Sequence, residues 1–267
     1  MFLEAELHLA YKIANTPILN FPFPHLYVEN IFPTDFYSKI QENLLEIKDM
    51  KSLPNSDTAN YGLSGYKDRF MMNLAKKDEM SKVKKDNQEF LRVFGEMFTK
   101  GDFSKLLQAK FKKFLDMRFQ YVENVSFYDE VRLFNDKKNY ALGPHTDKPS
   151  KVISILFYLP KDQKQKETGT SIYMPKDPNK LNKELPHIHY PHEDFHKVTT
   201  VPFVPNSAFC FIKTNNSFHG VEKLEMKDTD RWSLQYNLYI TEETLNQETA
   251  AKNKHLKAQE AKSNFSI

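Results

Sequence analysis

Hydrophobic residues stand at helical spacing through the first part of the chain. In the segment 78–115, Phe90, Val93, Phe94, Met97 and Phe98 recur among many lysines. This spacing gathers apolar side chains on one face of a helix and leaves the lysines on the solvated face. Residues 1 to about 117 are therefore predicted to be mostly helical.

The pattern changes near residue 118 to short β-rich runs divided by polar turns. These runs are 119–128, 131–134, 152–159, 171–174, 198–204, 208–212 and 232–240. Many short strands without intervening helices favour a sandwich or a barrel. No linker separates the two parts, so residues 1–240 are predicted to form a single domain, with the helical part packed on a β core of residues 118–240. The polar stretch 241–267 is expected to be a surface helix or a frayed tail.

Composition narrows the class of protein. Hydrophobic residues make up 40% and charged residues 27%, which is ordinary for a soluble globular protein. The net charge of +3 gives no reason to expect nucleic acid or an anionic membrane as a partner. No segment approaches ~20 consecutive apolar residues, and the N-terminal residues do not resemble a signal peptide. Cys210 is the only cysteine, which excludes a disulfide framework and fits a cytoplasmic location.

Two histidines and an aspartate are candidate ligands of a metal ion. His145 and Asp147 are two residues apart, and in an extended segment such residues point to the same side. His219 offers a third ligand from a distant stretch. Two imidazoles and one carboxylate leave open positions on an octahedral ion, an arrangement typical of non-haem Fe(II). A His-x-Asp pair alone is weak evidence, because such pairs are frequent by chance.

The stretch 231–239 alternates strictly between polar and apolar residues. Arg231 and Ser233 lie on the polar face, and Trp232 and Leu234 lie on the apolar face. Two interpretations remain open for Arg231: it faces water, or it points inward and binds a carboxylate through two hydrogen bonds. Tyr158 is either a half-buried strand tyrosine or a second group that supports the same carboxylate.

The ordered set of motifs resembles the Fe(II)/2-oxoglutarate-dependent oxygenase superfamily, in particular its prolyl-hydroxylase-like branch. The resemblance covers roughly residues 20–240 and rests on segments 22–28, 132–134, 145–147, 154–160, 168–173, 206–207, 219–220 and 231–233. The set is specific as a whole, although each piece is not. Thr168 departs from the pattern, since related proteins often have a second glycine there, and so does the loop 135–140.

This resemblance implies a fold and a reaction. The expected fold is α+β, a double-stranded β-helix (jelly roll) with N-terminal helices packed against it. His145, Asp147 and His219 match the iron ligands, Arg231 matches the residue that pairs with the distal carboxylate of 2-oxoglutarate, and Ser233 and Tyr158 match its hydrogen-bonding helpers. The implied activity is hydroxylation of a C–H bond coupled to decarboxylation of 2-oxoglutarate, with Fe(II) as cofactor and ascorbate as a candidate accessory reductant. Related halogenases lack the carboxylate that Asp147 supplies.

A second histidine cluster competes with the predicted iron ligands. It contains His187, His189, His192 and His196, and His192 and Asp194 form another His-x-Asp pair. The surrounding segment 176–197 has no alternating pattern and is predicted to be a long loop. Its histidines are solvated, or they contact a substrate at the mouth of the barrel, for which His192 and His196 are the candidates. Arg132, in the lead-in strand, is another candidate substrate contact.

Two other functions fit parts of the pattern. A cupin-type metal-dependent dioxygenase or isomerase would use a similar barrel without 2-oxoglutarate, and a non-catalytic jelly roll would bind a ligand without a metal-dependent reaction. The expected partner is a small-molecule or peptide substrate, with neither nucleic acid nor membrane. Substrate identity and oligomeric state are not readable from the sequence.

Overall fold

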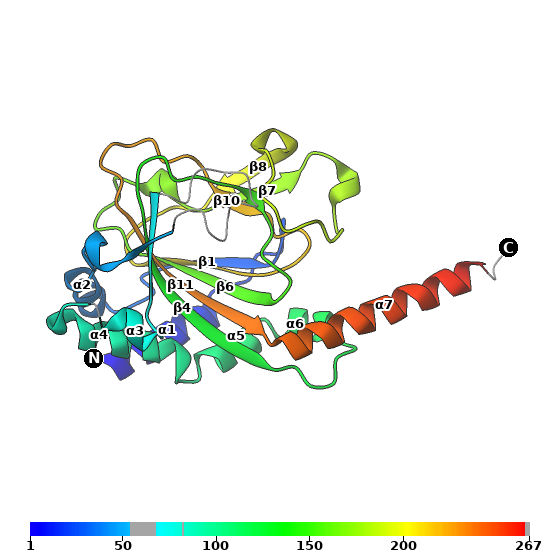
Figure 1. The fold of residues 1–267 in the computed structure, drawn as a ribbon, viewed down its shortest axis with the longest axis horizontal. Helices are drawn as coiled ribbons and strands as arrows, with labels where there is room; N and C mark the ends of the chain where they lie inside the picture. Colours follow the sequence, from blue (N-terminus) through cyan, green and yellow to red (C-terminus); the bar gives the residue numbers. More distant parts are fainter. Residues whose placement is uncertain (54–67, 82, 265–267) are drawn as a thin grey trace.

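The protein is an α+β structure in which two antiparallel sheets lie face to face (Figure 1). The computed structural model describes residues 1–53, 68–81 and 83–264. The α-helices are α1 (Phe2–Asn15), α2 (Thr34–Glu42), α3 (Lys77–Met80), α4 (Lys85–Thr99), α5 (Phe103–Lys110), α6 (Lys112–Arg118) and α7 (Glu242–Asn264). Short 3-10 helices are η1 (Ile47–Asp49), η4 (Lys166–Thr168), η5 (Pro178–Lys180) and η6 (His192–Asp194).

The strands form a seven-stranded and a four-stranded sheet. They are β1 (His25–Glu29), β2 (Lys51–Ser52), β3 (Arg69–Asn73), β4 (Phe127–Asp136), β5 (Leu142–His145), β6 (Lys151–Tyr158), β7 (Ser171–Pro175), β8 (Phe195–Thr200), β9 (Ser207–Ile212), β10 (His219–Val221) and β11 (Arg231–Ile240). The larger sheet has the order β1-β9-β6-β11-β4-β3-β2 and the smaller one β5-β10-β7-β8. From β4 onward the chain passes repeatedly between the sheets, which is the topology of a double-stranded β-helix. The predicted fold class is confirmed.

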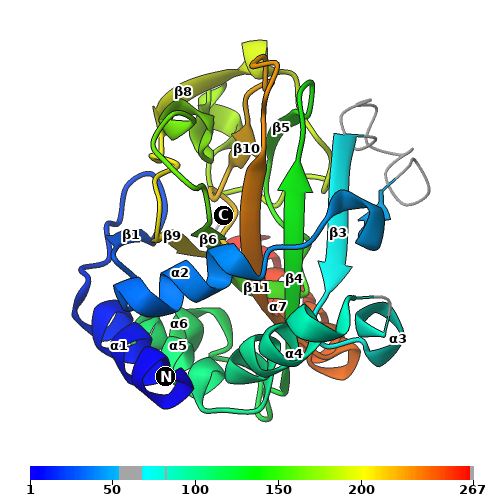
Figure 2. The ribbon, with the colours of Figure 1, turned by 90° about the vertical axis from the view of Figure 1, so that its left-hand side faces the viewer.

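The N-terminal helices cover the outer face of the larger sheet, as predicted (Figure 2). Helix α4 buries Leu91, Phe94, Met97 and Phe98 and keeps its charged residues outside. Phe98 packs against Phe157 of β6, so the amphipathic pattern of the helix meets the apolar face of the sheet. The main core therefore lies between the helices and the sheet.

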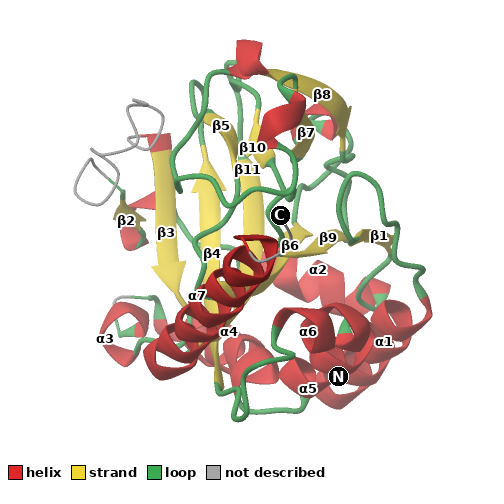
Figure 3. Cartoon of the chain, turned by 90° about the vertical axis from the view of Figure 1, so that its right-hand side faces the viewer, coloured by secondary structure: helices red, strands yellow, loops and turns green. Residues whose placement is uncertain are grey.

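The opposite face of the larger sheet looks toward the smaller sheet. At one end, a second core fills the space with aromatic and aliphatic side chains, among them Phe23, Tyr158, Ile172, Phe203 and Phe209. Nearer the other end, the same face carries polar residues, and the space between the sheets is a cavity. The larger sheet thus has helices on one face and the smaller sheet on the other (Figure 3), and part of the second face lines the cavity.

Three strands in the N-terminal part were not anticipated from the sequence. β1 pairs with β9, and β3 pairs with both β2 and β4, so the predominantly helical part also extends the larger sheet on both sides. The segment predicted as one helical stretch is divided into α3, α4, α5 and α6. The runs expected at 119–128 and 131–134 are instead a turn region followed by the single strand β4.

The polar C-terminal stretch forms helix α7, which extends away from the body of the protein (Figure 1). Its first turns are held by an ion pair between Glu248 and Arg118 of α6, in which both side chains are largely buried. The division of the chain into a domain and a tail stays a prediction. In the ranges that the structure describes, no helix has the length and apolar character needed to cross a membrane.

Candidate metal centre

Three side chains from two distant stretches meet between the sheets. His145 ends β5, Asp147 follows it, and His219 begins β10. One ligand atom from each lies within 4.8 Å of the others, and all three residues are at least nine-tenths buried. The backbone sets this arrangement, because His219 stands directly opposite His145 in the antiparallel pairing of β10 with β5. The structure therefore brings the three predicted ligands together.

The two imidazoles are oriented by hydrogen bonds to the backbone. Nδ1 of His145 lies 3.0 Å from the Gly143 carbonyl oxygen, and Nδ1 of His219 lies 2.9 Å from that of Ser217. Since a carbonyl only accepts, each Nδ1 carries the proton and donates. Nε2 of each ring is left with its lone pair, and an outer hydrogen bond of this kind is usual for a histidine that binds a metal.

The protonation states of the three groups suit a cation. Burial lowers the pKa of His145 well below its ordinary value, and His219 adds to this effect. Burial also lowers the pKa of His219. Burial by itself would raise the pKa of Asp147, but the nearby ammonium charge of Lys151 acts in the opposite direction, and that pKa is lowered. Two neutral imidazoles and a carboxylate are the forms that a divalent ion requires.

Both oxygens of the Asp147 carboxylate have partners. Lys151 Nζ lies 2.8 Å from Oδ1, and the Ser154 hydroxyl donates to Oδ2 at 2.9 Å. Both partners come from β6, the strand of the larger sheet that faces the centre. These contacts fix the orientation of the carboxylate toward the histidines.

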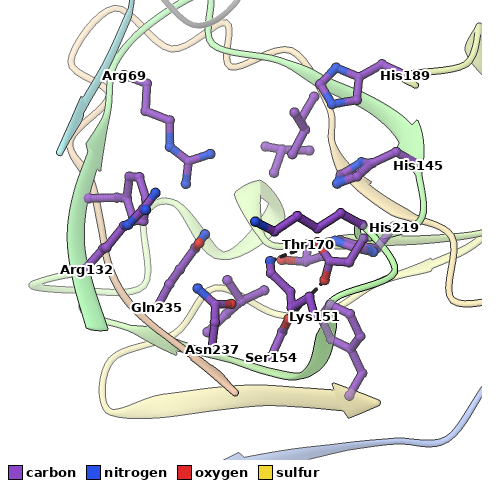
Figure 4. A pocket seen from close by; sticks show the side chains of 18 of the residues that line it. Arg69, Arg132, His145, Lys151, Ser154, Thr170, His189, His219, Gln235 and Asn237 are labelled. Carbon is purple, nitrogen blue, oxygen red and sulfur yellow. Dashed lines mark hydrogen bonds and ion pairs between the residues drawn. The ribbon is translucent and has the colours of Figure 1, made fainter. Parts of the chain in front are cut away.

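The centre opens into a cavity of about 330 Å³. Figure 4 shows Arg69 and Arg132 on the wall opposite His145, His189 and His219, with Gln235 and Asn237 between them. The amides and Arg231 belong to the polar face of β11, while Trp232, Leu234, Tyr236 and Leu238 pack into the main core. Arg231 therefore faces inward rather than toward water, and its role as a carboxylate-binding residue stays a prediction.

Arg231 is held rigidly at the inner end of the cavity. Its Nη1 donates to Asp136 Oδ2 at 2.6 Å and its Nε donates to the Thr168 carbonyl at 2.7 Å, while its side chain is 3% exposed. Asp136 also pairs with Arg69, whose Nε is 3.2 Å from Oδ1. Arg69, Asp136 and Arg231 stand opposite one another on β3, β4 and β11. Two guanidinium groups therefore share one fully buried carboxylate, which leaves positive charge at this end.

Ser233 and Tyr158, the other predicted 2-oxoglutarate contacts, are paired across β11 and β6. The Ser233 hydroxyl is buried and, among the described residues, has no hydrogen-bond partner. The Tyr158 hydroxyl donates to Thr170 Oγ1 at 2.8 Å, and Thr170 rather than Tyr158 lines the cavity. Ser233, like Tyr158, is not among the cavity-lining residues, so its contact with the co-substrate stays a prediction.

The histidine-rich segment contributes to the cavity through different residues than expected. His192 lies in η6 and His196 in β8, and neither is among the cavity-lining residues. His187 and His189 do line it, and the ring centroids of His189 and His145 are 4.8 Å apart. Arg132, the remaining predicted substrate contact, lines the cavity and pairs with Glu130.

Polar lining residues that were not predicted as site residues from the sequence include Arg69, Lys148, Lys151, Ser154, Gln235 and Asn237. The alternation of side chains along the strands could have predicted that Ser154 and Asn237 face the cavity, because each lies on the same strand face as a predicted site residue. Arg69 and Lys151 offered no such signal, since Arg69 lies in a part predicted to be mostly helical.

Comparison with known proteins found structural likenesses only. No protein-family model and no curated protein matches the sequence. The structure is similar over most of its length to solved 2-oxoglutarate/Fe(II) oxygenases. A prolyl hydroxylase from Trichoplax adhaerens has 8% identity and a TM-score of 0.46, with coverage of 92% of this chain and 91% of that one. A prolyl-4-hydroxylase from Pseudomonas putida has 12% identity and a TM-score of 0.46, with coverage of 86% and 98%.

A 2-oxoglutarate/Fe(II) oxygenase-family oxidoreductase from Burkholderia pseudomallei has 10% identity and a TM-score of 0.42, with coverage of 88% of this chain and 89% of that one. These likenesses assign no substrate to this chain. The function is therefore inferred from the residues of the centre.

Proposed function

We propose that the protein is an Fe(II)- and 2-oxoglutarate-dependent oxygenase that hydroxylates a C–H bond of its substrate. The observation that carries this proposal is the buried cluster of His145, Asp147 and His219, whose ligand atoms lie within 4.8 Å of one another at the wall of a cavity. Two imidazoles and one carboxylate with open positions suit non-haem Fe(II) better than a closed structural zinc site.

The residues present fit both the metal and the co-substrate. Nε2 of each histidine and one oxygen of Asp147 would hold the ion. The guanidinium of Arg231 keeps N–H groups beyond those bonded to Asp136 and Thr168, and these would donate to the distal carboxylate of 2-oxoglutarate. The Ser233 hydroxyl, which lacks a partner among the described residues, would donate to the same carboxylate.

When bound, iron(II), 2-oxoglutarate and dioxygen supply a decarboxylation that yields succinate and carbon dioxide and transfers the second oxygen atom to the substrate. The chain contributes placement. Lys151 and Ser154 hold the Asp147 carboxylate in position, and Asp136 holds Arg231. Tyr158 fixes Thr170 at the cavity wall, so the hydroxyl of Thr170 keeps its own proton for a ligand. The buried position of the centre restricts access of water.

An anaerobic titration tests the proposal. Adding Fe(II) and 2-oxoglutarate together is expected to produce a visible charge-transfer absorption that neither component produces alone. With air and a turnover assay, the protein is expected to form succinate. His145→Ala should abolish the absorption. His192→Ala, in the second His-x-Asp pair outside the cavity, is the matched control and should leave it unchanged.

A second pair of variants tests the co-substrate. Arg231→Gln is expected to raise the dissociation constant of 2-oxoglutarate about 100-fold, because it removes the charged guanidinium that donates two hydrogen bonds to a carboxylate. Arg231→Lys keeps the charge but not this paired geometry, so its dissociation constant should lie between those of Arg231→Gln and the wild type. Tight metal binding without any response to 2-oxoglutarate would instead favour a cupin-type enzyme and overturn the proposal.

A further inference from the structure

The outer half of the cavity holds cationic and amide groups that the proposed metal and co-substrate sites do not use. Arg132 Nη2 donates to Glu130 Oε1, and the Tyr239 hydroxyl donates to Glu130 Oε2 at 3.3 Å. Lys148 Nζ lies 4.8 Å from the centroid of the Tyr239 ring. These contacts join Arg132, Glu130, Tyr239 and Lys148 into one group, called here the rim cluster, of which all members except Glu130 line the cavity.

The cations of the cavity outnumber its carboxylates. Among the residues that the structure describes, five cationic side chains line it, namely Arg69, Arg132, Lys148, Lys151 and Arg231, and one carboxylate does, that of Asp147. Two more carboxylates, Asp136 and Glu130, pair with these cations from behind. Two positive charges remain. An iron(II) ion and a 2-oxoglutarate dianion have charges of equal size and opposite sign, so their binding would leave this surplus in place.

Parts of the rim cluster and of the cavity floor are available for hydrogen bonding. Arg132 Nε is buried and has no hydrogen-bond partner within the described ranges. Gln235 stands beside Arg132 in the register of β11 and β4, and Asn237 stands beside Ser154 in that of β11 and β6. In the described part of the chain, neither amide side chain makes a hydrogen bond within the protein. Figure 4 shows both amides in the space between Arg132 and the imidazoles.

We propose that the substrate is a small molecule with an anionic group, a carboxylate or a phosphate, bound by Arg132 and Lys148 of the rim cluster. Gln235 and Asn237 would bind polar groups between this anion and the carbon that is oxidised. This inference rests on the proposed function, because it takes the inner half of the cavity as the co-substrate site. The cavity volume of about 330 Å³ is near the lower end of small-molecule sites, and two ligands would share it.

Matched anionic and neutral probes test this proposal in protein loaded with Ni(II) and 2-oxoglutarate. The pairs are glycerol 3-phosphate with glycerol, and 3-hydroxybutyrate with butane-1,3-diol. The readout is the thermal shift as a function of probe concentration, which does not require turnover. At least one anion is expected to bind at least about tenfold more tightly than its neutral counterpart, since charge-assisted bonds to Arg and Lys are the stronger ones. The anion that binds identifies phosphate or carboxylate as the recognised group.

Three variants separate the rim cluster from a general effect of charge. Arg132→Gln and Lys148→Gln are each expected to weaken binding of the anion about five- to tenfold. Glu130→Gln removes the competing carboxylate and should strengthen binding. Lys161→Gln, at an exposed position outside the cavity lining, is the control and should change nothing.

The outcomes distinguish this proposal from the proposed function. Failure of the protein to bind 2-oxoglutarate in the presence of metal would contradict the proposed function. Normal 2-oxoglutarate binding with no preference for anionic probes, or a preference that Arg132→Gln and Lys148→Gln leave intact, would contradict only the anionic substrate. An effect of Arg132→Gln on 2-oxoglutarate as large as that on the probe would also overturn it, because Arg231 is assigned to the co-substrate.

Discussion

Lys151 Nζ lies 2.8 Å from Oδ1 of Asp147, so an ammonium group touches one of the three predicted metal ligands. Asp147 is 6% exposed and the Lys151 side chain 15% exposed, which gives the pair little screening by water. The ammonium stabilises the carboxylate in its ionised form. A metal ion at the same centre would have this positive charge as a close neighbour.

Replacing Lys151 by methionine is expected to strengthen metal binding. The variant removes a like charge beside the ion while keeping an apolar stem of similar length, and the gain should be about tenfold in affinity, or about 1.4 kcal/mol. Isothermal titration with Co(II) would measure it. Lys148→Met removes the same charge from a residue that lies over the Tyr239 ring, and it should have a smaller effect. Weaker binding by Lys151→Met would contradict this prediction and would mean that losing the contact with Asp147 outweighs removing the charge.

The unpartnered hydroxyl of Ser233 predicts opposite effects on stability and on binding. Ser233→Ala removes a buried hydroxyl that has no partner in the described structure, so the free energy of unfolding of the ligand-free protein should stay within about 0.5 kcal/mol or rise. The same change should raise the dissociation constant of 2-oxoglutarate about three- to tenfold. Urea unfolding and a ligand titration on the same samples would check both. A clear loss of stability would show that the hydroxyl has a protein partner instead.

Gly220 lets β10 approach β5 closely. A Cβ atom at this position would lie 2.3 Å from the Leu142 carbonyl oxygen and 3.0 Å from that of Gly143. Gly220→Ala should therefore push the strands apart and separate His219 from His145, with at least a tenfold loss of metal affinity. Gly101→Ala is the control, because its Cβ would meet a single atom, the Met97 carbonyl oxygen, at 3.3 Å. Equal metal affinity in both variants would contradict this role for Gly220.

The ion pair that anchors α7 predicts a dependence of stability on pH. Burial tends to raise the pKa of Glu248, but hydrogen bonds and charge from Arg118 outweigh it, so the pKa is lowered. A carboxylate whose pKa is lowered by folding stabilises the protein above its unfolded pKa of about 4.3, and this contribution is lost as the pH falls through the folded pKa. Glu248→Gln should cost about 2 kcal/mol at neutral pH, because Arg118 loses its buried partner.

Chemical denaturation between pH 7 and pH 3 would measure this effect. The difference between wild type and Glu248→Gln should shrink as the pH falls below about 4. Glu243→Gln, at an exposed position in the first turn of α7, should stay within about 0.5 kcal/mol of wild type at every pH. A difference between wild type and Glu248→Gln that stayed constant over the range would show that charge is not its source.

Short-range patterns carried most of the correct predictions from the sequence. The alternation in 231–239 predicted β11 and its two faces, and the i, i+2 spacing of His145 and Asp147 placed both side chains on one side of the chain. Both are consequences of strand geometry, which repeats every two residues. The same spacing rule does not apply to His192 and Asp194, because these residues form the 3-10 helix η6 and not a strand.

Long-range pairing accounts for what the sequence did not reveal. Arg69 reaches the cavity only because β3 pairs with β4, and no local pattern around Arg69 encodes that partner. His187 and His189 lie in a segment without periodicity, where nothing indicates which histidines turn inward. The link from His187 Nδ1 to the Thr146 carbonyl oxygen, at 2.6 Å, joins residues far apart in the chain. Contacts of this kind depend on the assembled tertiary structure.

The sheet pairing of β1 and β3 makes the helical half inseparable from the cavity. A fragment that started at residue 118 would leave β9 and β4 as unpaired edge strands, which are prone to aggregate. It would also lack the guanidinium of Arg69 in the cavity lining. The barrel alone would therefore not retain the complete cavity. Any change to the cavity lining has to consider residues on both sides of that boundary together.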